Sequence, residues 1–231
     1  MRILALTHEE SDPPQIFGEV VRERGHEVDA VPAAEARSLD ERYDGMIVLG
    51  GTMDTHEEER LPWLRDEKRI IRKALAREIP VFGICLGGQL LAEVAGASVA
   101  RLPRPEIGWY DVELTAEGRK DAIFSALPQK FESYQWHKYA FELPRGAVLL
   151  ARNASGPQAY RLNGCWGVQF HPEVDPETLE LWIDHYDTDE GARELGLDAV
   201  SGKADARSRI PAWNEIGRML CSRFLDVVER R

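Results

Sequence analysis

The sequence predicts an open α/β fold, in which a mostly parallel, doubly wound sheet has helices on both faces and an antiparallel extension. Two observations predict this fold. In the first hundred residues, short apolar segments alternate with amphipathic helical patterns, which is typical of parallel strands joined by right-handed crossovers. After residue 100, short strand-like segments follow one another with only turns between them, which is typical of antiparallel pairing.

The first half alternates regularly between strands and helices. The predicted strands are residues 2–7, 26–31, 43–49 and 79–84, and the predicted helices are residues 16–24, a helix that begins near Pro62, and residues 89–95. Gly25 ends the first helix, and Pro62 suits a first helical turn. The third and fourth strands are continuous apolar runs, as expected for strands buried on both faces.

The second half predicts shorter strands and then helices. The predicted strands are residues 109–114, 148–152, 158–162 and 166–170. Leu179, Ile183 and Tyr186 mark an amphipathic helix. The polar stretch 187–209 contains three glycines and predicts a loosely packed excursion, followed by one more amphipathic helix. We expect one domain over residues 1–231, with residues 187–231 as a C-terminal helical extension that has no assigned function.

Composition excludes several classes of function. The 231 residues are 43% hydrophobic and carry a net charge of −11, which opposes nonspecific attraction to nucleic acid or to an anionic membrane. No apolar run reaches the roughly 18–20 residues that span a bilayer, and the first residues lack the pattern of a signal peptide. The three cysteines are too scattered for a disulfide framework or a CxxC metal site. We therefore expect a cytoplasmic chain with reduced thiols and neither nucleic-acid nor membrane partners.

The most informative motif is Gly83-Ile84-Cys85-Leu86-Gly87-Gly88-Gln89. It sets a cysteine at a tight turn between a buried strand and a helix, and small neighbours relieve the crowding of that turn. A helix N-terminus favours the thiolate form, and the amide of Leu86 would point toward an oxyanion on an attacked carbonyl. The alternative is a buried structural cysteine, but the glycine spacing favours a nucleophile.

A nucleophilic cysteine needs a base, and His171 in Gln169-Phe170-His171-Pro172-Glu173 follows a predicted buried strand. Residues two apart in an extended segment point the same way, so Glu173 can orient the imidazole. The set predicts a cysteine–histidine–carboxylate relay for acyl transfer. The alternative is a histidine that caps a strand and a glutamate that begins a helix. The remaining histidines, His8, His26, His56, His137 and His185, are interpreted as ordinary structural or surface residues.

Together the two motifs resemble the class I glutamine amidotransferase family, whose signature is G-x-C-x-G-x-Q followed much later by H-P-E. The segments Pro62-Trp63-Leu64 and Glu106-Ile107-Gly108-Trp109 are similar to its single-domain branch, which is related to the glutaminase part of GMP synthase.

This resemblance implies specific roles for the motif residues. Cys85, His171 and Glu173 would be catalytic, and Gly51 after the third strand would supply a second oxyanion amide beside that of Leu86. Gln89 would contact the substrate, and segment 131–141 would bind the glutamine head group through its backbone. The residues expected at that contact are Tyr134, Gln135 and Trp136.

The resemblance also implies a reaction. The Cys85 thiolate would attack the side-chain amide of glutamine, and the thioester would release glutamate and ammonia without a metal or an organic cofactor. A synthetase that consumes ammonia would lie on a separate chain, since this sequence has no G-x-x-x-x-G-K-[ST] loop. One alternative is a stand-alone γ-glutamyl hydrolase or peptidase, which Tyr139 slightly favours because the family often has an acid at that position. The other is a non-catalytic, flavodoxin-like regulatory module, which has no reason to keep the three catalytic residue types.

Overall fold

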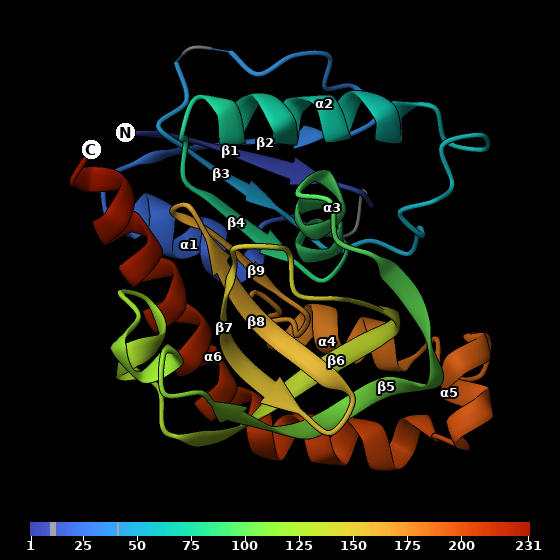
Figure 1. The fold of residues 1–231 in the computed structure, drawn as a ribbon. Helices are drawn as coiled ribbons and strands as arrows, with labels where there is room; N and C mark the ends of the chain where they lie inside the picture. The colour runs from blue at the N-terminus through green and yellow to red at the C-terminus, as the bar shows by residue number, and fades with distance from the viewer. Residues whose placement is uncertain (10–12, 41) are drawn as a thin grey trace.

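The computed structural model describes residues 1–9, 13–40 and 42–231, and within them nine strands form one mixed sheet in the order β2-β1-β3-β4-β9-β8-β7-β5-β6 (Figure 1). The first five strands of this order are parallel, and the other four extend the sheet by antiparallel pairing. The parallel strands are β1 (Arg2–Thr7), β2 (Glu27–Pro32), β3 (Gly45–Val48), β4 (Val81–Ile84) and β9 (Cys165–Val168). The antiparallel strands are β5 (Val99–Leu114), β6 (Lys130–Phe141), β7 (Val148–Asn153) and β8 (Gly156–Leu162). The predicted α/β fold class is confirmed.

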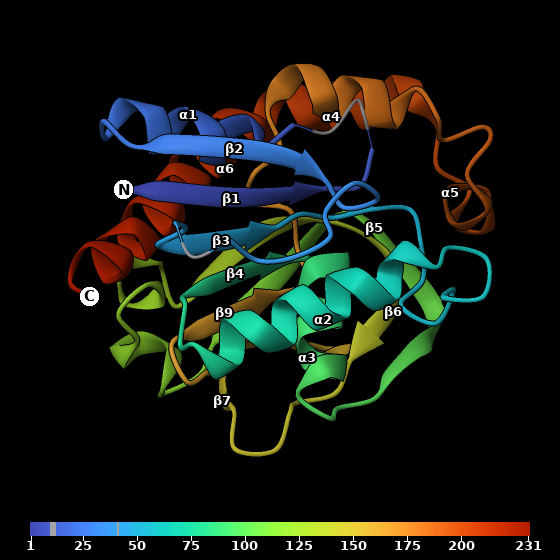
Figure 2. The same ribbon diagram turned by 90° about the horizontal axis from the view of Figure 1, so that it is seen from above.

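Helices cover both faces of the sheet (Figure 2). On one side are α2 (Trp63–Ala76) and α3 (Leu86–Val94), and on the other are α1 (Gln15–Glu23), α4 (Pro176–Ile183) and α6 (Ala199–Glu229). Because side chains alternate along a strand, Ile3 and Ala5 of β1 pack in the α1–α6 core, whereas Leu4 and Leu6 pack in the α2–α3 core. The expected burial of both faces of the parallel strands is therefore observed.

The antiparallel part contains more strand than the sequence predicts. β5 begins at Val99, well before the predicted residue 109, and its partner β6 has no counterpart among the predicted strands. Pro103 and Pro105 lie in β5 where its register with β6 shifts between Arg101 and Glu106. A proline cannot donate to a ladder but is tolerated at such an irregularity, and this hid the strand in the sequence.

The predicted loosely packed excursion over residues 187–209 is wrong. Residues Glu190–Leu195 form α5, and α6 begins at Ala199. Side chains at the helix starts explain the difference: Asp189 accepts a hydrogen bond from the amide of Ala192, and Asp198 accepts from the amides of Val200 and Ser201. α6 changes direction along its length (Figure 1), as expected for a helix with Pro211 in its interior.

None of the helices in the described part of the chain combines the length and the apolar character needed to cross a membrane.

Candidate active site

The motif residues meet where three neighbouring parallel strands end. Gly50 and Gly51 follow β3, Cys85 follows β4, and His171 follows β9, and these strands are adjacent in the order β3-β4-β9. Ligands of open α/β sheets bind outside the carboxyl ends of the strands, so this edge is the expected position for a site.

Cys85 occupies a sharp turn between β4 and α3. Its backbone has φ 49° and ψ −107°, a left-handed conformation that is unfavourable for any residue with a side chain. The Cys85 amide donates to Val168 O at 2.9 Å, which ties the turn to β9. The side chain is only 5% exposed, and its sulfur lies 3.7 Å from the carbonyl oxygen of Trp136.

The glycines around Cys85 permit close backbone approaches. A Cβ added at Gly87 would lie 2.1 Å from Val48 O, and one added at Gly83 would lie 2.6 Å from Gly87 O. Both neighbours are backbone atoms, which have no flexible side chain to move aside. The glycine spacing of the motif therefore has a direct steric cause in the packing of α3 against β3 and β4.

His171 and Glu173 form a buried pair beside Cys85. The Nδ1–H of His171 donates to Glu173 Oε1 at 2.8 Å, and the two residues are 4% and 3% exposed. Burial alone would lower the pKa of His171, but the Glu173 carboxylate and the Cys85 sulfur raise that pKa well above its usual value. His171 Nε2 is buried and has no hydrogen-bond partner among the residues described, so it is available on the side of the ring opposite Glu173.

The loop after β3 closes over His171. A Cβ added at Gly50 would lie 2.8 Å from His171 Cε1 and 3.6 Å from Cys85 Cβ, so Gly50 lies directly against both side chains. Only glycine fits this contact, which gives the Gly50-Gly51 pair a steric role beyond that of a tight turn.

A second histidine, His8, fixes this glycine loop from behind. Its Nδ1–H donates to Gly50 O at 2.8 Å, and its Nε2–H donates to Glu67 Oε1 at 2.9 Å. Because both ring nitrogens face acceptors, the cationic imidazolium satisfies both contacts. Burial alone would lower the pKa of His8, but Glu67 outweighs it and raises that pKa above its usual value. The carbonyl and amide of one trans peptide point in opposite directions, so the bond to Gly50 O turns the Gly51 amide away from His8.

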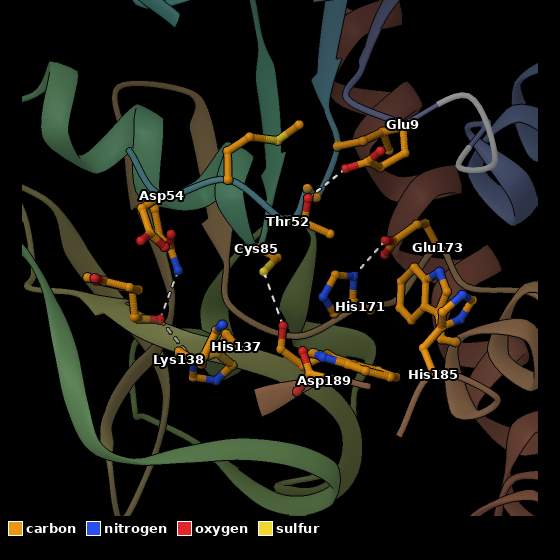
Figure 3. Close-up of a pocket in the computed structure, with 18 of the residues that line it drawn as sticks. Glu9, Thr52, Asp54, Cys85, His137, Lys138, His171, Glu173, His185 and Asp189 are labelled. Carbon is orange, nitrogen blue, oxygen red and sulfur yellow. Dashed lines mark hydrogen bonds and ion pairs between the residues drawn. The ribbon is translucent and has the colours of Figure 1, made fainter. Parts of the chain in front are cut away.

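All these side chains line one cavity of about 470 Å³ (Figure 3). The loop after β3 contributes Gly51, Thr52, Met53 and Asp54 to its wall, and β6 contributes residues 136–139. Opposite β6, Trp182, His185, Thr188 and Asp189 come from α4 and the segment that follows it. In Figure 3, Cys85 lies centrally, with His171, Glu173 and His185 on one side and Asp54, His137 and Lys138 on the other.

The structure brings some of the expected substrate contacts to this cavity and not others. Gln89 and Trp136 line it. The Gln89 amide donates to Tyr139 O at 2.8 Å and lies 3.4 Å from Gln169 Oε1, and the amide of Gln169 lies 3.8 Å from Cys85 Sγ. Gln89 is therefore part of a buried hydrogen-bonded chain that reaches the sulfur through Gln169.

Tyr134 and Gln135 are not among the residues that line the cavity. The Tyr134 hydroxyl lies 3.2 Å from the Tyr186 hydroxyl, and the Gln135 side chain donates to Ser133 and Gln158. Their side chains are buried among neighbouring elements, and β6 presents Trp136, His137, Lys138 and Tyr139 to the cavity instead.

The sequence interpretation also missed several residues of the site. His8 and His185 were taken as ordinary histidines, but His8 supports the glycine loop and His185 lines the cavity. A signal for the partner of His8 was present: Glu67 lies on the buried face of α2 between Leu64 and Ile71, where a carboxylate is costly unless it is paired. Within the described residues, no cluster of three or more His, Cys, Asp or Glu side chains is arranged to hold a metal ion.

The fold and the site define the class of protein: an α/β enzyme in which cysteine, histidine and glutamate side chains meet at the carboxyl edge of a sheet. The sequence profile described as Glutamine amidotransferase class-I matches residues 16–182. The chain therefore belongs to the class I glutamine amidotransferase family, which confirms the resemblance seen in its motifs.

Individual relatives agree with this membership. The glutamine amidotransferase-like protein YfeJ of Salmonella typhimurium is 29% identical over 98% of this chain and 96% of its own length. The glutamine-hydrolysing GMP synthase of Saccharolobus solfataricus has a separate subunit that is 30% identical over 67% of this chain and 80% of its own length. The crystal structure of a glutamine amidotransferase from Thermotoga maritima superposes with a TM-score of 0.88, at 31% identity and 98% coverage of both chains.

Other relatives match over only part of their length. The γ-glutamyl-L-1-hydroxyisopropylamide hydrolase of a Pseudomonas species is 31% identical over 57% of this chain, and the match spans 48% of that protein. The match to the GMP synthase of Aeropyrum pernix, at 34% identity over 71% of this chain, spans 32% of that longer protein.

Proposed function

We propose that this enzyme hydrolyses the side-chain amide of glutamine through a thioester on Cys85 and releases glutamate and ammonia. The observation that carries the proposal is the convergence of Cys85, the His171–Glu173 pair and Gly51 on one cavity at the ends of three adjacent strands. Hydrolysis of a γ-amide needs a nucleophile, a proton donor and an oxyanion site in this relation.

The first half of the reaction forms the thioester. The Cys85 sulfur attacks the carboxamide carbon, a C–S bond forms, and the carbonyl electrons move to oxygen. The amides of Gly51 and Leu86 donate to this oxyanion; the Leu86 amide is in the first turn of α3, where backbone N–H groups lack helical partners. His171 Nε2–H then gives its proton to the nitrogen as the C–N bond breaks, and ammonia leaves. The raised pKa of His171 supports this step, because the imidazolium is present when the proton is needed.

The second half returns the enzyme to its starting state. Neutral His171 accepts a proton from water, the hydroxide attacks the thioester carbon, and the C–S bond breaks to give glutamate and the thiolate. Glu173 keeps Nδ1 protonated throughout, so that Nε2 exchanges the proton. We assign substrate contacts to Gln89 and Trp136, and we place the reaction in the cytosol, where the free thiols of the chain remain reduced.

We propose further that the ammonia is used by a synthetase on another chain, as the name of the Saccharolobus relative, one separate subunit of a GMP synthase, suggests for that protein. A second candidate is a γ-glutamyl hydrolase that releases an amine or a peptide and needs no partner. The cavity favours it: about 470 Å³ is in the range of about 300–1,000 Å³ that encloses drug-sized ligands, so there is room for a leaving group larger than ammonia.

The test is the release of glutamate from glutamine and from a panel of γ-glutamyl amines and peptides, with Cys85→Ser as the control. We expect release by the parent and none by the variant. Faster turnover of γ-glutamyl peptides than of glutamine would select the hydrolase. Absence of glutamate release from every compound, or full activity in Cys85→Ser, would refute the proposed function.

A further inference from the structure

The helix α6 contacts the backbone on both sides of the catalytic pair. The indole Nε1–H of Trp213 donates to His171 O at 2.7 Å, and the side-chain amide of Asn214 donates to Val174 O at 2.7 Å. A Cβ added at Gly217 would lie 1.9 Å from Pro172 O, so α6 and the segment 171–174 are in backbone contact there. Residues 213, 214 and 217 lie on one side of the helix, because residues four apart are one turn above each other.

The segment that α6 contacts has no regular structure of its own. Residues 169–174 follow β9 and precede α4 without belonging to a helix or a strand. Their buried polar groups need partners from elsewhere in the chain: the His171 amide donates to Tyr134 O at 3.0 Å, and Glu173 O accepts from the Ile16 amide at 3.1 Å. The carbonyls of His171 and Val174 take theirs from α6, so this helix completes the support of the segment.

Trp213 is itself fixed in position. Its side chain is 2% exposed and packs edge-on against Phe170 and parallel to Phe131, with ring centroids 5.7 Å and 6.4 Å apart. A rigid donor that contacts the carbonyl of His171 restricts rotation of that peptide, and therefore the direction in which the imidazole points.

We propose that Trp213, Asn214 and Gly217 are positioning residues that set the imidazole of His171 for proton transfer. Residues 187–231, which have no role in the sequence interpretation and extend beyond the 16–182 match, thereby take part in the reaction. This inference rests on the proposed function of Cys85 and His171. It deepens that function, because displacement of a reacting group by about 1 Å can lower a rate by about 100-fold.

The principal test is Trp213→Phe, which keeps an aromatic ring and removes the N–H donor. We expect kcat to fall by about 10- to 100-fold with less than about a threefold change in KM, since the substrate contacts remain. We also expect the pH midpoint of Cys85 alkylation by iodoacetamide to move upward by about half a pH unit or more, because a misplaced imidazolium stabilises the thiolate less. Mass spectrometry of the Cys85 peptide isolates this signal, since burial raises the pKa of Cys165 to about 11 and that of Cys221 further.

The matched control is Phe224→Leu on the same helix. Phe224 is fully buried and packs against Phe82 and Trp166, away from residues 171–174, so its loss lowers the melting temperature without acting on His171. Asn214→Leu, which removes a partly buried donor with little change in volume, is a second variant in case Trp213→Phe does not fold; its expected loss in kcat is about 3- to 10-fold.

The outcomes separate the two proposals. A lowered kcat together with a shifted alkylation profile, in either variant and not in Phe224→Leu, supports the positioning role. Variants that lose only melting temperature, with kcat and alkylation profile like those of the parent, overturn it. If the parent hydrolyses none of the γ-glutamyl compounds, the proposed function fails, but the alkylation profile still tests the positioning of His171 because it needs no substrate.

Discussion

The buried pair of His8 and Glu67 predicts a pH-dependent loss of stability in Glu67→Gln. Both side chains are 0% exposed, so solvent does not screen their interaction. Removal of one partner of a buried ion pair costs about 3–5 kcal/mol, and we expect a value near 3 kcal/mol at about pH 5.5 because His8 can lose its proton in the variant. Near pH 9, where His8 is neutral, only a hydrogen bond to a charged group is weakened, and the expected loss is about 1 kcal/mol.

The sign follows from the proton bound by His8. In the parent, the pKa of His8 is raised in the folded state, so its stabilising contribution is complete below the unfolded pKa of about 6.5 and is lost as the pH rises through the folded value. In Glu67→Gln, burial keeps His8 neutral, and the folded state loses stability as the pH falls below about 6.5. The difference between parent and variant therefore grows toward acid by at least about 1.4 kcal/mol per pH unit between about pH 6.5 and 5.5.

Urea unfolding at both pH values measures this difference directly. Asp66→Asn is the matched control, because it removes the neighbouring carboxylate of α2, which pairs with Arg69 at the surface, and should change stability by less than about 0.5 kcal/mol at either pH. A loss in Glu67→Gln that is constant with pH, or that increases toward pH 9, would refute the charged pair beneath the glycine loop.

Three further predictions concern the cavity and its turn. Glu173→Gln should lower kcat by about 10²- to 10⁴-fold with little change in KM, because the Nδ1 proton loses its acceptor charge; an unchanged kcat for glutamate release would exclude a catalytic role. Gly87→Ala should lower the free energy of unfolding by at least about 3 kcal/mol, measured by urea titration, because its Cβ would meet Val48 O at 2.1 Å; native stability would contradict the close approach. Trp182→Leu should raise KM about 10-fold more for γ-glutamyl amides of bulky amines than for glutamine, since Trp182 forms the wall beside His171; equal changes would place the leaving group elsewhere.

The parallel half of the fold could be predicted because its signals are local. The strand before Cys85 is a continuous apolar run, and the glycines that follow it have no alternative steric reason, so the sequence alone indicates the turn. The pairing of β5 with β6 is different, because the prolines of β5 read as a break and the partner strand that accommodates them lies about thirty residues away. For α5 and α6 the capping residues Asp189 and Asp198 were present in the sequence, but the polar composition around them concealed the helices.

The site shows the same division between local and distant information. Cys85, Gly51 and the His171–Glu173 pair lie in recognisable motifs, and the structure brings them to one cavity. The support behind them comes from single residues in unrelated segments: His8 from the loop after β1, Glu67 from α2 and Trp213 from α6. None of these residues has a motif, because each acts through one contact that only the folded chain creates.

The position of Trp213 has a consequence for the order of events during synthesis. Ribosomes deliver the chain from its N-terminus, so Cys85, His171 and the whole sheet emerge before residues 213–217 do. A nascent polypeptide halted between α4 and α6 would hold every reacting group and still lack the donors for the carbonyls of His171 and Val174. Hydrolysis by such a translation intermediate would be slow, and glutamine would be protected from wasteful breakdown until the enzyme is nearly complete.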